Sequence, residues 1–185
     1  MSRAFALLLA AMTVLAVDPA RAQGFNMGGL FGGGFGNSSP IPRELVSFSG
    51  RYSPGTIVIS TGERRLYLVL PNGQALRYGI GVGREGFSWS GTHRITAKKE
   101  WPGWTPPSQM LARRPDLPRY LPGGIQNPLG ARAMYLGSTL YRIHGSNEPE
   151  TIGHAVSSGC IRMTNEDVTE LYNRVSVGTT VVVGN

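Results

Sequence analysis

Cys160, the only cysteine among the 185 residues, carries the strongest chemical signal in the sequence. It lies in the run SSGCIRM at positions 157–163. Gly159 permits a tight turn beside the sulfur, and the N–H groups of such a turn, with that of Cys160, can converge as an oxyanion hole. Arg162 adds a positive charge that favours the thiolate. We therefore predict that Cys160 is a nucleophile, although a lone cysteine is more often a small buried residue.

A thiol that reacts as its thiolate needs a base, and the sequence offers three histidines. His144 ends an apolar stretch and is followed by Gly145, which places it where a strand ends and catalytic groups often lie. His154 lies in the loop before the cysteine, and His93 begins a strand far upstream. For these two, a surface histidine is the simpler interpretation. We predict that His144 is the base.

Two segments together resemble the signature of a known family. The sequence HGSN at 144–147, followed by SSGCIRM at 157–163, is similar to the motifs of the L,D-transpeptidases with a YkuD-type catalytic domain. Segments 65–68, 127–133 and 165–168 also resemble this family, and the resemblance covers roughly residues 54–184. One departure is Ser158, which stands where the family frequently has a histidine.

The resemblance implies acyl transfer on peptidoglycan stem peptides. In this family a cysteine attacks the carbonyl of the third stem residue, usually a diamino acid, and expels the terminal D-alanine. Carried over, Cys160 is the nucleophile and His144 the base. Gly159 supplies oxyanion-hole backbone together with the cysteine, and the carbonyl of Gly145 orients the histidine. Arg162 is expected to bind substrate or to have a structural role, and Ser158 is expected to support the site.

The partner that finally takes the acyl group is left open by the sequence. The thioester is expected to pass to an amine on a second stem peptide, a lipoprotein or an outer-membrane protein, which gives a 3–3 cross-link or an attachment. The same site working with water would make a carboxypeptidase or an amidase. A module that binds the cell wall without catalysis is a further alternative, because the formal net charge of +7 suits an anionic partner.

Other partners and cofactors are not expected. One cysteine and three dispersed histidines lack the spacing of metal ligands, so we predict neither a metal nor another cofactor. Nucleic acid fits the charge, but the sequence has no dense basic run. The signs of export described next also argue against it.

The N-terminal residues have the pattern of a secretory signal peptide, predicted at 1–22. Arg3 is followed by the apolar stretch 4–17 and by Ala20-Arg21-Ala22, a signal-peptidase pattern. The apolar stretch is shorter than the ~20 residues of a membrane-spanning helix, so no membrane span is expected. The protein is predicted to be exported to the periplasm or cell envelope. Residues 23–53, glycine-rich at 24–42, are predicted to be a flexible tether.

Residues 54–185 are predicted to be the catalytic domain, mainly β, with a YkuD-like β-sandwich or mixed sheets and one late α-helix. Alternating and β-branched patterns predict strands at 56–60, 65–70, 74–82, 93–99, 133–136, 140–143 and 179–183. The helix is expected at 164–175, capped by Thr164. A proline-rich loop at 101–130 with one short helix at 108–114 is expected to be a lid or cleft wall, or else a large surface loop.

Overall fold

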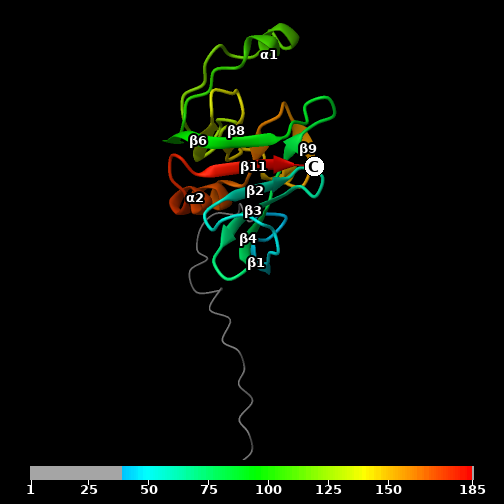
Figure 1. Ribbon diagram of the computed structural model, residues 1–185. Helices are drawn as coiled ribbons and strands as arrows, with labels where there is room; N and C mark the ends of the chain where they lie inside the picture. Colours follow the sequence, from blue (N-terminus) through cyan, green and yellow to red (C-terminus); the bar gives the residue numbers. More distant parts are fainter. Residues whose placement is uncertain (1–38, 185) are drawn as a thin grey trace, which may run out of the picture. The chain divides into compact units, whose positions relative to one another are not determined.

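The computed structural model describes residues 39–184, most of which belong to strands and the loops that join them (Figure 1). The predicted signal peptide and the first part of the predicted tether, up to residue 38, lie outside the described residues. None of the helices within 39–184 is long and apolar enough to cross a membrane.

The described residues contain one nine-stranded mixed sheet, in the order β1-β4-β3-β2-β11-β6-β7-β8-β10. The predicted antiparallel meander is confirmed in β2, β3 and β4, and β11 then enters between β2 and β6, parallel to the first and antiparallel to the second. The bounds are β1 Glu44–Ser47, β2 Ile57–Ser60, β3 Arg65–Leu70, β4 Gln74–Gly79, β6 Gly91–Glu100, β7 Arg132–Leu136, β8 Arg142–His144, β10 Ile161–Arg162 and β11 Thr180–Gly184.

The core lies on the face of the sheet that carries every second residue of its central strands. Ile57 and Ile59 of β2, with Val181 and Val183 of β11, are buried, as expected for a period-two pattern. The late helix α2 (Asn165–Arg174) covers this core with Val168 and other apolar residues. The mainly β fold with one late helix, predicted from the sequence, is therefore confirmed.

Helix α2 begins and ends where its sequence predicts. Thr164 is the N-cap, and its Oγ1 accepts a hydrogen bond of 3.1 Å from the backbone N–H of Asp167. This bond satisfies one of the N–H groups that the first helical turn leaves without a partner. Lys98 binds the other end, because its ammonium group donates to the carbonyl oxygens of Tyr172 and Val175. The helix is thus fixed at both ends against the sheet.

Two boundaries differ from the predictions. The tether was predicted to reach residue 53, but residues 44–47 form β1, an edge strand that pairs with β4. The predicted strand 74–82 is interrupted, because β4 ends at Gly79 and the chain then leaves it as β5 (Val82–Gly83), which pairs with β9 (Ala155–Ser157). Gly81 makes the crossing possible: its N–H and carbonyl exchange hydrogen bonds with those of Arg162, and a side chain on it would meet the Thr151 carbonyl.

The proline-rich loop between β6 and β7 contains α1 (Ser108–Arg113), which lies beyond β6, away from β11 (Figure 1). The short helix predicted at 108–114 is confirmed within one residue. Asn127 ties the loop together: its side chain accepts from the N–H of Leu129 and donates to the carbonyls of Leu121 and Pro122. The loop is thus a folded structure supported by its own hydrogen bonds.

Candidate active site

The last two strands of the sheet bring the predicted base and nucleophile into one place. β10 runs parallel to β8, with Arg162 opposite His144. The N–H of Met163 donates to the carbonyl of His144 at 2.9 Å, which fixes the register. Because Cys160 immediately precedes β10, it reaches the same end of the site as the histidine that ends β8.

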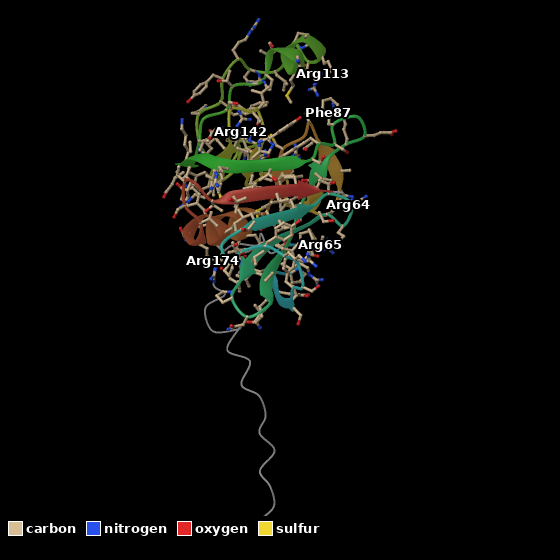
Figure 2. All side chains as sticks on the ribbon, viewed as in Figure 1. Arg64, Arg65, Phe87, Arg113, Arg142 and Arg174 are labelled. Carbon is tan, nitrogen blue, oxygen red and sulfur yellow. The ribbon has the colours of Figure 1, made fainter. Side chains whose placement is uncertain are left out.

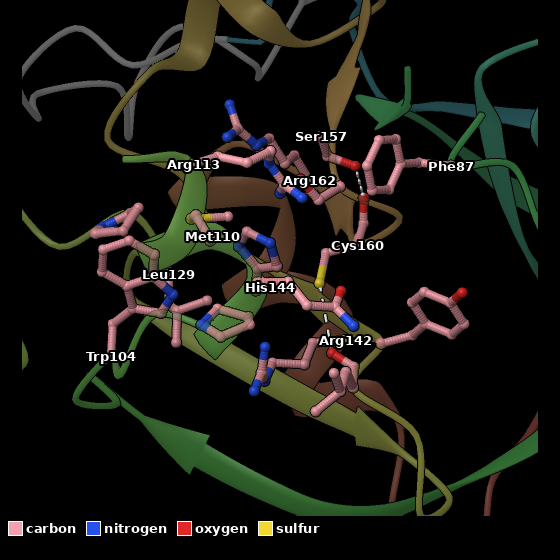
Figure 3. A pocket seen from close by; sticks show the side chains of 16 residues that line it. Phe87, Trp104, Met110, Arg113, Leu129, Arg142, His144, Ser157, Cys160 and Arg162 are labelled. Carbon is pink, nitrogen blue, oxygen red and sulfur yellow. Dashed lines mark hydrogen bonds between the residues drawn. The ribbon is translucent and has the colours of Figure 1, made fainter. Parts of the chain in front are cut away.

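Both side chains face a cavity of about 350 Å³. Figure 3 shows the Cys160 sulfur and the His144 imidazole directed into it. Ser158 and Arg162 line the same cavity, whereas neither His93 nor His154 does. Four of the six predicted site residues therefore meet at one cavity, and the other two, Gly145 and Gly159, belong to the backbone that frames it.

His144 is held in the tautomer that a base requires. Its Nδ1 lies 2.6 Å from the carbonyl oxygen of Gly145, a distance at which Nδ1–H donates to that oxygen. Nε2 is then the unprotonated nitrogen, and no group within 39–184 occupies it. The side chain is buried, and burial is the main cause that lowers the pKa of His144 to about 3. The bond to Gly145 raises this pKa, and the charges of Arg162 and Arg142 lower it further.

The turn before Cys160 is fixed by Ser157 and Gly159. Gly159 has φ +106°, and a Cβ on it would lie 2.6 Å from the ring of Tyr141, so glycine is required on both grounds. The buried Ser157 hydroxyl donates to the Cys160 carbonyl at 2.6 Å and accepts from the Gly159 N–H at 3.1 Å. The Cys160 sulfur lies 3.7 Å from the carbonyl oxygen of Leu140, which its thiol faces.

These bonds bear on the predicted oxyanion hole. The N–H of Gly159 already donates to Ser157, whereas the N–H of Cys160 has no acceptor within the described part of the chain. Of the two predicted donors, the Cys160 N–H is the one available to a developing oxyanion. The contribution of Gly159 stays a prediction, since it requires the Ser157 hydroxyl to give up its bond.

Gly145 is enclosed so closely that no side chain fits there. A Cβ would lie 2.3 Å from Oδ1 of Asn165, the first residue of α2. That oxygen accepts a 2.8 Å hydrogen bond from the N–H of Ala131. Asn165, at the start of α2, therefore links the end of the proline-rich loop to Gly145, whose carbonyl oxygen accepts the hydrogen bond from His144. The sequence placed Asn165 in the family pattern without indicating this role.

Arg162 is half-buried beside the cavity and forms an ion pair with Glu148, with Nη1 2.8 Å from Oε2. Its guanidinium charge is thus partly balanced, which weakens the stabilisation of a thiolate that the sequence suggested. Its place in the cavity lining is compatible with substrate binding. Both expected roles, substrate binding and a structural role, stay predictions.

Trp89 and Tyr141 support the turn, and sequence reasoning missed both. The indole N–H of Trp89 donates to the Gly159 carbonyl at 2.6 Å. Its ring stacks on Tyr141, with centroids 4.2 Å apart and planes 2° from parallel. Tyr141 in turn lies against Gly159. A lone tryptophan in a glycine-rich loop was the only signal, and its partner lies 52 residues away along the chain.

Replacing Trp89 with phenylalanine is expected to loosen this turn. The ring stack is retained, but the Gly159 carbonyl loses its donor, which costs about 1 kcal/mol of stability. We expect the rate of Cys160 acylation at saturating reagent to fall several-fold. Trp101→Phe is the matched control, because Trp101 is exposed and does not line the cavity. An acylation rate equal to that of the control would show that Trp89 does not position the cysteine.

The proline-rich loop forms one wall of the cavity. Trp104, Met110 and Leu129 contribute apolar surface, and Figure 3 shows Trp104 and Phe87 on opposite sides. Arg113 of α1 approaches Phe87, with its guanidinium carbon 5.7 Å from the ring centroid (Figure 2). Of the two interpretations left open by the sequence, a cleft wall is therefore the correct one.

Within 39–184 no three histidine, cysteine or acidic side chains are grouped as metal ligands. The arrangement consists instead of a partly accessible thiol, a neutral imidazole with a free nitrogen, and one available backbone donor. Such a set suits covalent acyl transfer through a thioester.

Comparison with known proteins places the chain in a family. Residues 54–183 match the model of the YkuD L,D-transpeptidase catalytic domain. The chain is 41% identical over 155 residues to the probable L,D-transpeptidase YbiS of Escherichia coli, which covers 76% of this chain and 47% of that protein. The chain belongs to the L,D-transpeptidase family, whose members are acyltransferases, and it spans about half the length of the curated relatives it matches.

Solved structures agree on the fold. L,D-transpeptidase 3 of Mycobacterium tuberculosis matches with a TM-score of 0.56 and 20% identity, over 70% of this chain and 60% of that one. A crystal structure from Brucella melitensis, described as a probable carnitine operon oxidoreductase, matches with a TM-score of 0.54 and 47% identity. It covers 80% of this chain and 96% of its own.

Proposed function

We propose that this protein is a peptidoglycan L,D-transpeptidase whose acyl carrier is Cys160. The observation that carries the proposal is the pairing of β8 with β10. This pairing places a buried, neutral histidine and the only cysteine at one cavity. The family match supports the substrate class, stem peptides of the cell wall. A binding module without catalysis would need neither the fixed tautomer of His144 nor the glycine turn before the cysteine.

The reaction begins with a proton transfer. Nε2 of His144 takes the thiol proton as the Cys160 sulfur attacks the carbonyl carbon of the third stem residue. The oxyanion that forms is stabilised by the N–H of Cys160. The C–N bond to the terminal D-alanine then breaks, and the imidazolium gives its proton to the leaving amine. The product of this half-reaction is a thioester between the peptide and Cys160.

The second half-reaction reverses these roles. An amine enters the cavity and gives a proton to His144. The amine nitrogen then attacks the thioester carbon. Collapse of the intermediate expels the Cys160 sulfur, which regains the proton. A second stem peptide gives a 3–3 cross-link, whereas a lipoprotein or outer-membrane protein gives an attachment. Water in place of the amine gives a carboxypeptidase or amidase from the same thioester.

Product analysis of the wild-type protein tests this function. We expect incubation with a tetrapeptide donor to give a protein species heavier by the acyl group, with release of D-alanine. Adding an amine acceptor is expected to convert the species into a transfer product, measured by mass spectrometry. Hydrolysed donor alone, at any acceptor concentration, would instead assign the hydrolytic activity. Binding to cell-wall sacculi with no change in their peptides would assign the binding module.

We also propose that residues 1–22 direct export, so that the enzyme works in the periplasm or cell envelope. The apolar run 4–17 and the small residues at 20 and 22 support this, as does the cell-wall substrate of the family. The glycine-rich residues that follow would then separate the cleaved end from the catalytic domain. N-terminal sequencing of the secreted protein tests this, with Gln23 expected as the first residue.

A further inference from the structure

The cavity beside Cys160 has an unbalanced set of charged side chains. Arg113, Arg142 and Arg162 line it, and no aspartate or glutamate is among the side chains that do. Arg162 is ion-paired with Glu148. Arg142 forms no ion pair with any acidic side chain between residues 39 and 184. The cavity is therefore suited to an anionic group and has an unused cation within it.

Arg142 lies beside the base on the same strand. It precedes His144 by two residues on β8, so both side chains project from one face of that strand. The guanidinium lies over Tyr135, its cross-strand partner on β7, whose ring centroid is 5.3 Å from the guanidinium carbon. Figure 3 draws Arg142 together with Cys160 among the side chains that line the cavity.

The donors of Arg142 are not used within the protein. The side chain is half-buried, and its buried Nε has no hydrogen-bond partner in the described residues. The two outer guanidinium nitrogens likewise form no hydrogen bond in the described residues, and they, rather than the enclosed Nε, are the donors that a ligand acceptor can reach. A planar guanidinium stacked on an aromatic ring suits a carboxylate, which it binds with two parallel hydrogen bonds.

We propose that Arg142 binds a free carboxylate of the acyl donor and makes the cavity selective for donors that carry one. This inference rests on the proposed function, because the donor is taken to be a stem peptide. The inference concerns the two carboxylates that belong to the residues joined by the bond that breaks. One is the terminal carboxylate of the leaving D-alanine, and the other is a second carboxylate on the side chain of the diamino acid.

A carboxylate at this place would also act on the base. The charges of Arg162 and Arg142 both lower the pKa of His144, after the larger effect of burial. A bound carboxylate beside Arg142 would offset that charge and make Nε2 a stronger base while the donor is present. Apolar neighbours such as Leu129 and Met110 exclude water and strengthen the interaction. Binding and activation of the base would thus occur together.

The test measures donor binding without turnover, in the Cys160→Ala protein. Four tetrapeptides are compared by calorimetry: the parent, the C-terminal amide, the side-chain amide and the double amide. Each is titrated into proteins that also carry Arg142→Gln, Arg142→Lys or the control Arg51→Gln. Arg51 is exposed and outside the cavity, and its replacement makes the same change of charge. Circular dichroism and melting curves establish that each variant is folded.

We expect the parent donor to bind about 10- to 100-fold more weakly to Arg142→Gln, and normally to Arg51→Gln. Arg142→Lys should recover part of the loss, because it keeps the charge without the planar fork. If one amide binds equally well to Arg142→Gln and to the protein that retains Arg142, the carboxylate that this amide replaces is the one that Arg142 binds. Equal weakening of all four donors, or none, would overturn the inference alone. If no donor binds even the Cys160→Ala protein that retains Arg142, the proposed function is overturned as well.

Discussion

Replacing Cys160 with alanine is expected to abolish covalent capture of an acyl group and to lower the transfer rate by about 10⁴-fold or more. The cavity then contains His144, the backbone donor and the arginines, but no atom that can form the thioester. Intact-mass spectrometry after incubation with a carbapenem-type β-lactam measures the adduct directly. The wild-type protein should gain the mass of one molecule, since the described residues contain one thiol at the cavity and the sequence has no other.

The loss should not come from unfolding. Within residues 39–184 the Cys160 side chain has one polar contact, the 3.7 Å approach of its sulfur to the Leu140 carbonyl. The turn is instead held through its backbone by Ser157 and Trp89. We therefore expect Cys160→Ala to melt within a few degrees of wild type. Cys160→Ser should likewise lose adduct formation and transfer, because a hydroxyl is a far weaker nucleophile beside a neutral imidazole. An adduct of normal mass on folded Cys160→Ala would exclude Cys160 as the carrier.

Several features of the site could be predicted because they are local in sequence. Gly159 before Cys160 indicates a turn with positive φ, which the structure has. Thr164 before an amphipathic run indicates a capped helix, and its cap bond is present. The place of His144 at a strand end favoured it over the other two histidines and the family resemblance selected it; it alone of the three lines the cavity, and its role as base stays a prediction.

Other features depend on pairing between distant segments, and the local sequence does not contain them. The alternation at 74–82 predicts one strand, but Gly81 permits the chain to cross and pair with Arg162. The segment that begins with charged Glu44 has no pattern that predicts a strand. It forms β1 because it lies at the edge of the sheet and pairs with β4 alone. Nothing local in the sequence distinguishes Arg142, since its proposed role depends on Tyr135 across the sheet and on a cavity wall contributed by residues 104–129.

The second large effect concerns the base. Replacing His144 with glutamine is expected to slow acylation of Cys160 by about 10²- to 10⁴-fold, because no other group at Nε2's position accepts the thiol proton. His154→Gln is the matched control: His154 is exposed and does not line the cavity, so it should acylate at the normal rate. Stopped-flow or mass-spectrometric rates with the same β-lactam measure both. A normal rate in His144→Gln would show that His144 is not the base.

The burial of His144 makes a prediction about acid pH that separates it from an exposed histidine. With a pKa of about 3, the imidazole stays neutral and able to accept a proton well below pH 6. The rate of acylation should therefore not fall between pH 7 and pH 5 through protonation of this histidine. An exposed histidine with its ordinary pKa of ~6.5 would be mostly protonated and inactive at pH 5. An acid limb of the rate profile centred near pH 6.5 would contradict the burial of the base.

The same shift links the site to the stability of the fold. In the unfolded chain His144 recovers its ordinary pKa, so the unfolded state binds more protons than the native state between about pH 6.5 and pH 3. Stability that is fully present above pH 6.5 is therefore lost as the pH falls, by up to about 5 kcal/mol. Burial raises the pKa of Asp167, which acts in the opposite direction. Because Asp167 is common to both proteins, urea unfolding of wild type and His144→Gln at pH 7 and pH 4 isolates the histidine. The variant should lose less stability on acidification, and parallel losses would show that folding does not lower the pKa of His144.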